Sequence, residues 1–105
     1  MTKEELYQLS FQLILHSGNA RSLAMEAMND AKEKNFEAAR EKLKEADAAF
    51  VEAHHIQTEL ITKESNGEDF EIPIILIHGQ DHLMMAMTLK DLAKEIIDLR
   101  EELQR

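Results

Sequence analysis

A long helical periodicity, almost free of residues that break helices, is the feature that most constrains this chain. Its 105 residues contain three glycines and one proline, so there is room for only two or three interruptions. Apolar or small residues recur about every 3.5 positions from Leu6 to Ala31 and again from Phe36 to Leu60. This spacing is typical of helices that pack along one seam. The pattern therefore predicts an all-α fold.

Capping and turn signals divide the chain into three helices. Thr2 begins a capping box, Asn35 is a suitable N-cap for a second helix, and Pro73 fits the first turn of a third. We expect helices over about 3–33, 36–63 and 74–103, with a loop over about 64–73. Three long helices with short connections predict a single domain, residues 1–105, folded as an antiparallel up-down-up three-helix bundle.

Composition excludes several classes of function. The net charge is −9, which argues against binding to nucleic acid or to an anionic membrane surface, because both require basic residues. Cysteine is absent, so disulfides, thiolate metal sites and cysteine nucleophiles are excluded. The N-terminal stretch lacks a basic segment followed by a long apolar one, and no window resembles a membrane span. We therefore expect a cytoplasmic protein without direct membrane insertion.

The expected third helix carries more apolar surface than a lone bundle can cover. Residues 74–77 and 83–87 are apolar in every direction of a helical turn, and a helix that is apolar all round is normally buried on all sides. Two neighbouring helices cover about half of such a helix. The surplus predicts self-association through the third helix, although the residues alone do not give the number of copies.

A polar cluster interrupts this apolar helix in "IHGQDHLMM", residues 77–85. His78 and His82 lie about 40° apart around a helix, and Asp81 lies about 60° to the other side of His78. Such a cluster is costly as pure structure, so a structural polar knot competes with two functional interpretations. One is a zinc site built on the two histidines, as in helical zinc proteins. The other is a nucleophilic histidine that accepts a phosphoryl group. There is no glycine-rich nucleotide loop, so that phosphate would come from another protein.

Asp81 lies in a separate row, together with Ile74, Ile77, Met84 and Thr88. If this seam packs against copies of itself, the aspartates converge and repel one another. They are stable there only when protonated or bound to a cation, and oxygen ligands favour Mg²⁺, Mn²⁺ or Ca²⁺.

Three stretches resemble the lactose/cellobiose-type IIA components of the bacterial sugar phosphotransferase system. "HGQDHLMMAM" followed by "LKDLAKEIIDL" is similar to the family's third helix, whose usual form is H-A-Q-D-H-L-M. "SGNARSLAMEAM" is similar to its G-x-A-R-S segment, and "NFEAAREKLKEADAAFVEAHHIQTELI" to its second helix. The resemblance covers essentially the whole chain, and "LILHSGNARS" is closer to the β-glucoside or chitobiose type than to the lactose type.

The resemblance implies a three-helix bundle that forms a homotrimer. It implies that His78 accepts phosphate from phospho-HPr and passes it to a cysteine of the cognate IIB protein, which serves the membrane component IIC. The substrate of the pathway would be a β-linked disaccharide of the cellobiose or chitobiose type. It implies that Asp81 meets its symmetry mates at the trimer axis around a divalent cation, Mg²⁺ or Mn²⁺.

Three further positions are candidates near the phosphate. His82 and Gln80 match family positions beside the reactive histidine and are candidates for orienting the phosphate. Ser17, with Gly18 after it, interrupts the apolar row of the first helix, either because the third helix approaches the phosphate site there or because small residues pack the helices. Gly79 replaces the family's usual alanine, which predicts local flexibility beside His78. A non-catalytic interaction bundle and a small zinc protein using His78 and His82 remain the alternatives.

Overall fold

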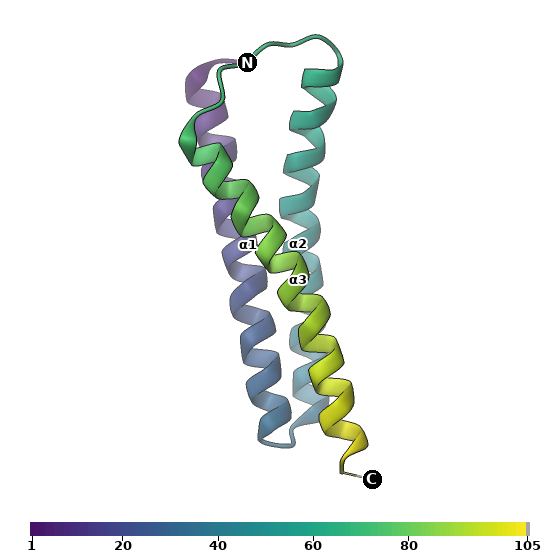
Figure 1. Ribbon diagram of the computed structural model, residues 1–105. Helices are drawn as coiled ribbons and strands as arrows, with labels where there is room; N and C mark the ends of the chain where they lie inside the picture. Colours follow the sequence, from purple (N-terminus) through teal and green to yellow (C-terminus); the bar gives the residue numbers. More distant parts are fainter. Residues whose placement is uncertain (105) are drawn as a thin grey trace.

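Three long helices in one up-down-up bundle make up the computed structural model, which describes residues 1–104. Helix α1 spans Lys3–Lys32, α2 spans Phe36–Ser65 and α3 spans Ile74–Glu102. The bundle measures 55 × 20 × 17 Å. Helix α3 begins beside α1, crosses the bundle obliquely and ends beside α2 (Figure 1). The predicted all-α, three-helix architecture is confirmed, and each helix begins and ends within two residues of its expected bounds.

The ends of the helices show which sequence signals act through side chains. The hydroxyl of Thr2 accepts a hydrogen bond of 3.1 Å from the backbone N–H of Glu5, as a capping residue should. Asn35 precedes α2, but its side chain makes no capping hydrogen bond. The expected side-chain cap at Asn35 is therefore wrong, although the boundary is right. Pro73 lies immediately before α3 rather than inside its first turn.

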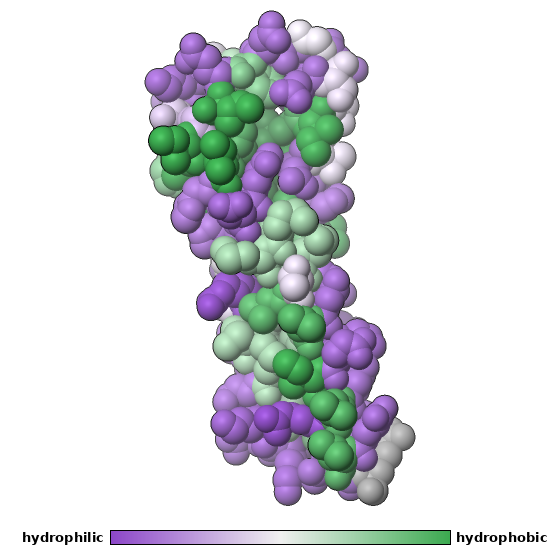
Figure 2. All heavy atoms as spheres, viewed as in Figure 1, coloured by the Kyte–Doolittle hydropathy of each residue, from purple (hydrophilic) through white to green (hydrophobic). Residues whose placement is uncertain are grey.

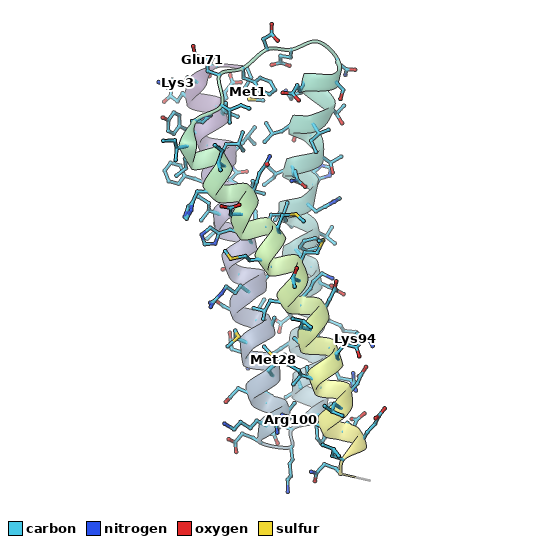
Figure 3. The ribbon with its side chains drawn as sticks, viewed as in Figure 1. Met1, Lys3, Met28, Glu71, Lys94 and Arg100 are labelled. Atoms are coloured by element: carbon cyan, nitrogen blue, oxygen red, sulfur yellow. The ribbon has the colours of Figure 1, made fainter. Side chains whose placement is uncertain are left out.

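The segment that joins α2 to α3 folds back over the start of the chain. Met1, Lys3 and Glu71 lie together at this end of the bundle (Figure 3) and line a hollow of about 320 Å³. The amino group of Met1 lies 2.6 Å from Glu68 Oε1. Gly67 adopts a φ of 93° just after α2, a conformation that glycine adopts without strain. The loop thus brings the first residue of α3 next to α1.

Small residues at seven-residue intervals allow the helices to lie close together. The buried rows contain alanine or serine at most levels of the bundle, and leucine or isoleucine fills the rest: Ser10, Ser17, Ala24 and Ala31 in α1, Ala39, Ala46 and Ala53 in α2, Gly79, Ala86 and Ala93 in α3. Side chains of this size bury little area each but let backbones approach. Spacing by seven keeps each seam facing its neighbour along the bundle.

Ion pairs join α2 to α3 at two levels of the bundle. Lys90 occupies a buried row of α3, and its ammonium lies 3.0 Å from Asp47 Oδ1 and 5.0 Å from the centre of the Phe50 ring. Towards the C-terminal end, Arg40 lies 2.9 Å from Asp98 and 3.1 Å from Glu101. Burial opposes the charge on Lys90, but its hydrogen bonds to carboxylates outweigh burial and raise its pKa.

None of the helices within residues 1–104 has the length and hydrophobicity needed to span a membrane. An apolar stripe, interrupted by Asp81, nevertheless remains exposed along α3. Figure 2 shows hydrophobic residues gathered at the upper end of α3 and again along its lower half. The exposed large side chains of this stripe are Ile74, Ile77, Met84, Met85, Leu92, Ile96, Leu99 and Leu103. The surplus of apolar surface predicted for this helix is therefore present on its outer face.

Candidate functional site

His78 and His82 form a contacting pair on α3. Residues four apart face each other on a helix, and the Nε2 atoms of the two rings lie 3.1 Å apart. The rings are nearly perpendicular, at 83°, with their centres 4.4 Å apart. His78 is exposed and His82 is half-buried. At this distance one Nε2 donates a proton to the lone pair of the other. The pair therefore holds an accessible imidazole nitrogen beside a hydrogen-bond donor.

Gly79 holds this part of α3 against α1. A Cβ atom added at Gly79 would lie 3.1 Å from Leu13 Cδ2 and 3.3 Å from the carbonyl oxygen of Ser10. These distances are shorter than ordinary van der Waals contact, so the absence of a side chain allows the two helices to approach. Gly79 is buried and helical. Its observed role is close packing beneath the histidine pair rather than the flexibility that its helix propensity predicted.

Asp81 lies about 60° around α3 from His78 and about 100° from His82. It is exposed and is flanked along the outer stripe by Ile77, 54% exposed, and Met84, 48% exposed. A lone carboxylate surrounded by apolar side chains is unusual on a surface that faces only water. The structure thus places Asp81 in the middle of the apolar stripe, where the sequence predicted a self-association seam.

Gln80 and Ser17 are not brought to the histidine pair by any hydrogen bond among residues 1–104. Gln80 is two residues from both histidines, and side chains two apart do not face each other on a helix. Ser17 is 1% exposed, and its hydroxyl has no hydrogen-bond partner in the described part of the chain. A Cβ at Gly18 would meet nothing within 4 Å. The close approach of α3 to α1 therefore occurs at Gly79 rather than at Gly18.

An apolar groove of about 520 Å³ begins one turn beyond His82, between α1 and α3. Met84, Met85 and Leu92 from α3 line it together with Met25 and Arg21 from α1. Methionine side chains adapt to partners of different shapes. Arg21 and Met25 were missed as candidate site residues, because only the packing of two helices brings them beside Met85. Their one sequence signal was the "SGNARSLAMEAM" segment in which both lie.

The described residues do not complete a metal site of three or more ligands. Within residues 1–104, no group of three histidine, aspartate or glutamate side chains is placed to hold one ion. A hydrolytic zinc site needs three protein ligands and an open position for water. The histidine pair supplies two, and among residues 1–104 neither Asp81 nor another carboxylate is placed to complete a group of three with it. The geometry therefore favours chemistry on an imidazole nitrogen over zinc-dependent hydrolysis.

Comparison with protein families places this geometry in a known context. A family model described as "PTS system, Lactose/Cellobiose specific IIA subunit" matches residues 8–101. The chain is 53% identical over 100 residues to the lichenan-specific phosphotransferase enzyme IIA component of Bacillus subtilis (strain 168), covering 95% of this chain and 91% of that protein.

Solved structures agree with this match. The cellobiose-specific enzyme IIA from Bacillus anthracis has a TM-score of 0.92 and 55% identity, covering 99% of this chain and 94% of the other. The IIA component for N,N'-diacetylchitobiose from Escherichia coli, solved in complex with HPr, has a TM-score of 0.81 and 36% identity, covering 95% of this chain and 97% of that one.

Proposed function

The chain belongs to the lactose/cellobiose-specific IIA family of the phosphotransferase system, and on this premise we propose that His78 carries the phosphoryl group. The observation that supports the proposal is the pair of Nε2 atoms 3.1 Å apart on an exposed face of α3. In the productive arrangement, His82 Nε2–H donates to His78 Nε2. The Nε2 lone pair of His78 then accepts this hydrogen bond, its ring proton is on Nδ1, and the lone pair becomes available to phosphorus when His82 releases it.

The proposed transfer needs no water and no nucleotide. The lone pair of His78 Nε2 attacks the phosphorus of the donor phosphohistidine, and the donor's phosphorus–nitrogen bond breaks as the new one forms. The electron pair of the broken bond returns to the donor's ring. His82, freed from its bond to the lone pair, donates its N–H to a phosphoryl oxygen. Positioning and charge stabilisation of this kind supply most of the catalysis in phosphoryl transfer.

HPr is the proposed donor, because the chitobiose IIA relative was solved in complex with HPr. The proposed acceptor is a cysteine of the cognate IIB, which passes the phosphate to sugar entering through IIC. The part of the groove formed by Met85 and Met25 adjoins the histidine pair and is the proposed docking surface for these partners. Relatives named for lichenan and cellobiose support a β-linked disaccharide of the cellobiose or chitobiose type. A carrier between these components would work in the cytoplasm.

The exposed stripe of α3 supports assembly as a homotrimer around this helix. Ile77 and Met84 would then be covered by their symmetry mates, and three copies of Asp81 would converge at the axis. Each copy provides a single carboxylate in this stripe, and carboxylate oxygen suits Mg²⁺ or Mn²⁺. Three Asp81 side chains together would hold the ion. The ion would neutralise their mutual repulsion, so its role would be structural rather than catalytic.

Phosphorylation by purified components tests the proposal directly. The chain is incubated with phosphoenolpyruvate, enzyme I and HPr, and its mass is measured for an acid-labile, base-stable phosphate. We expect one phosphate per chain, lost in His78→Ala with unchanged helicity by circular dichroism. His54→Ala, which removes an exposed histidine of α2, is the matched control and should label normally. Stoichiometric labelling of His78→Ala would refute the assignment.

The same experiment separates the alternatives. A chain that never labels but binds zinc tightly would support the zinc protein, and a chain that does neither would support a purely structural bundle. For Asp81, sedimentation of Asp81→Leu tests the seam. We expect a trimer that is more stable than the parent chain when divalent cations are removed, because the substitution ends the repulsion. An unchanged assembly would count against convergence of Asp81 at an axis.

A further inference from the structure

The two imidazole nitrogens that face each other on α3 have the separation of a bidentate metal chelate. The Nε2 atoms of His78 and His82 are 3.1 Å apart while the ring centres are 4.4 Å apart. The nitrogens thus lie on the facing edges of the rings. We propose that this pair binds a single divalent transition metal ion, Zn²⁺ or Cu²⁺, through both Nε2 atoms, and that the bound ion excludes the phosphoryl group from His78.

The distance between the nitrogens fits one ion bound to both. Zinc–imidazole bonds are about 2.0–2.1 Å long, so two nitrogens 3.1 Å apart subtend about 100° at the ion. That angle lies between the octahedral and tetrahedral values, both of which Zn²⁺ and Cu²⁺ accept with water in the remaining positions. In the hydrogen-bonded pair each Nε2 is aimed at the other, so each ring must turn by about 40° to aim its lone pair at the shared ion.

The proton balance of this exchange is simple. In the free pair, one Nε2 carries the proton that the other accepts. When the ion binds, that ring moves its proton to Nδ1, so both neutral rings present an Nε2 lone pair and no net proton is released. Two water molecules leave the ion as the two nitrogens enter. Protonation of either ring abolishes a ligand, so binding should weaken in acid.

The proposed site is separate from the Asp81 seam. Imidazole nitrogens select Zn²⁺ and Cu²⁺, whereas carboxylate oxygen selects Mg²⁺ and Mn²⁺. Asp81 lies about 60° around α3 from His78 and forms no group of three possible ligands with the two histidines in the described part of the chain, so it is not among the proposed ligands. The histidine pair is also exposed enough to admit an ion, because His78 is exposed and His82 half-buried. The two kinds of ion should therefore bind independently.

The chain contains a second pair of histidines that provides a control. His54 and His55 are both exposed on α2, but adjacent residues on a helix point in different directions. The His54 ring also packs against Phe50, with their centres 5.7 Å apart. Two histidines in this arrangement cannot chelate one ion. Loss of metal binding in variants of α3, but not of α2, would locate the site.

Titration of the unphosphorylated chain with CuCl₂ or ZnCl₂ tests the metal site without reference to transfer. We expect one ion per chain, bound more tightly for Cu²⁺ than for Zn²⁺, as expected for nitrogen ligands. His82→Gln keeps a polar side chain but should weaken affinity by about tenfold or more, whereas His54→Gln should leave it unchanged. In nuclear magnetic resonance spectra, Cu²⁺ should broaden the ring protons of His78 and His82 first. Unchanged affinity in His82→Gln, or lost affinity in His54→Gln, would overturn the proposal.

The second half of the proposal rests on the proposed function and has its own test. The initial rate of labelling by phospho-HPr is measured with the chain metal-free, saturated with Zn²⁺, and returned to the metal-free state with EDTA. A mock reaction with an unrelated HPr acceptor shows that Zn²⁺ leaves the donor active. We expect at least a tenfold slower rate with Zn²⁺ and full recovery with EDTA. Equal rates with a saturated site would refute exclusion, while failure to label the metal-free chain would refute the proposed function instead.

Discussion

Replacing Gly79 with valine tests the close approach of α3 to α1 beside the histidine pair. Even the first carbon of a side chain would lie 3.1 Å from Leu13 Cδ2 and 3.3 Å from the Ser10 carbonyl oxygen. Leu13 is fully buried and the carbonyl belongs to a helix backbone, so neither can move far. The two methyl groups of valine add to this crowding. Helix α3 must then shift outward or distort.

The expected cost follows from overpacking. Extra methyl groups in a close-packed interior typically cost about 1–3 kcal/mol. The better helix propensity of valine relative to glycine returns a few tenths of a kcal/mol. We therefore expect Gly79→Val to lower the free energy of unfolding by about 2 kcal/mol, which corresponds to a fall in melting temperature of about 10 °C for a domain of this size.

Gly18→Val is the matched control, because a Cβ at Gly18 meets nothing within 4 Å. It should change the free energy of unfolding by less than about 0.5 kcal/mol. Both variants are unfolded by heat and by urea at one protein concentration, with circular dichroism as the readout, since assembly makes stability depend on concentration. If the two variants unfold alike, the close approach at Gly79 is not real. Labelling at temperatures where both are folded should persist, because His78 and His82 share one helix.

Three other perturbations have expected outcomes. Ser17→Ala should raise the free energy of unfolding by about 1 kcal/mol in urea denaturation, because it removes a buried hydroxyl that has no hydrogen-bond partner among residues 1–104. A fall in the free energy of unfolding would show that the hydroxyl has a hydrogen-bond partner. Lys90→Leu should leave the melting temperature unchanged or higher, because its carboxylate partners stay solvated; a large fall would show that the ion pairs are essential. Hydrogen bonds from Lys94 and then Arg40 lower the pKa of Asp98. These interactions therefore stabilise the fold at pH values above the pKa of this carboxyl in the unfolded chain. The stabilisation is lost as the pH falls through the lower pKa of the folded chain. Asp98→Asn should flatten the fall of melting temperature from neutral to acid pH, and an unchanged slope would refute this assignment.

Most of the fold was predictable because each helix carries its own periodic signal. The rows from Leu6 to Ala31 and from Phe36 to Leu60 specify a buried face regardless of which helix covers it. The failures concern interactions that depend on two helices at once. Asn35 has the right residue type for a cap and lies at the N-cap position of α2, but its side chain makes no capping hydrogen bond. Lys90 occupies a position that its heptad assigns to the core, and only the packed bundle reveals the carboxylate of Asp47 beside it.

The candidate site also combines features that a single helix determines with features that depend on the packing of two helices. The contact between His78 and His82 follows from their spacing within one helix, so the sequence predicts it without knowledge of the bundle. Gln80 was proposed because it matches a family position beside the reactive histidine, and its role in orienting the phosphate stays a prediction. The groove at Met85 is completed by Met25 from α1. The relative placement of two helices depends on side-chain packing, which the periodicity of a single helix does not predict.

The run from His78 to His82 shows how one helical turn serves three surfaces. Steps of 100° per residue send Gly79 into the contact with α1, Asp81 to the outer stripe, and both histidines to the edge between them. The distance between the two imidazole rings is set by their spacing along α3 alone. The distance between this part of α3 and α1 depends on Gly79. Changes that loosen the bundle should therefore leave the chemistry of the imidazoles intact and alter only what can reach them. An insertion of one residue between His78 and His82 would rotate the rest of α3 by about 100°. It would separate the rings, but it would also turn Leu83, Ala86 and Ala93 out of the buried seam, so substitution of His82 is the sharper test of the pair.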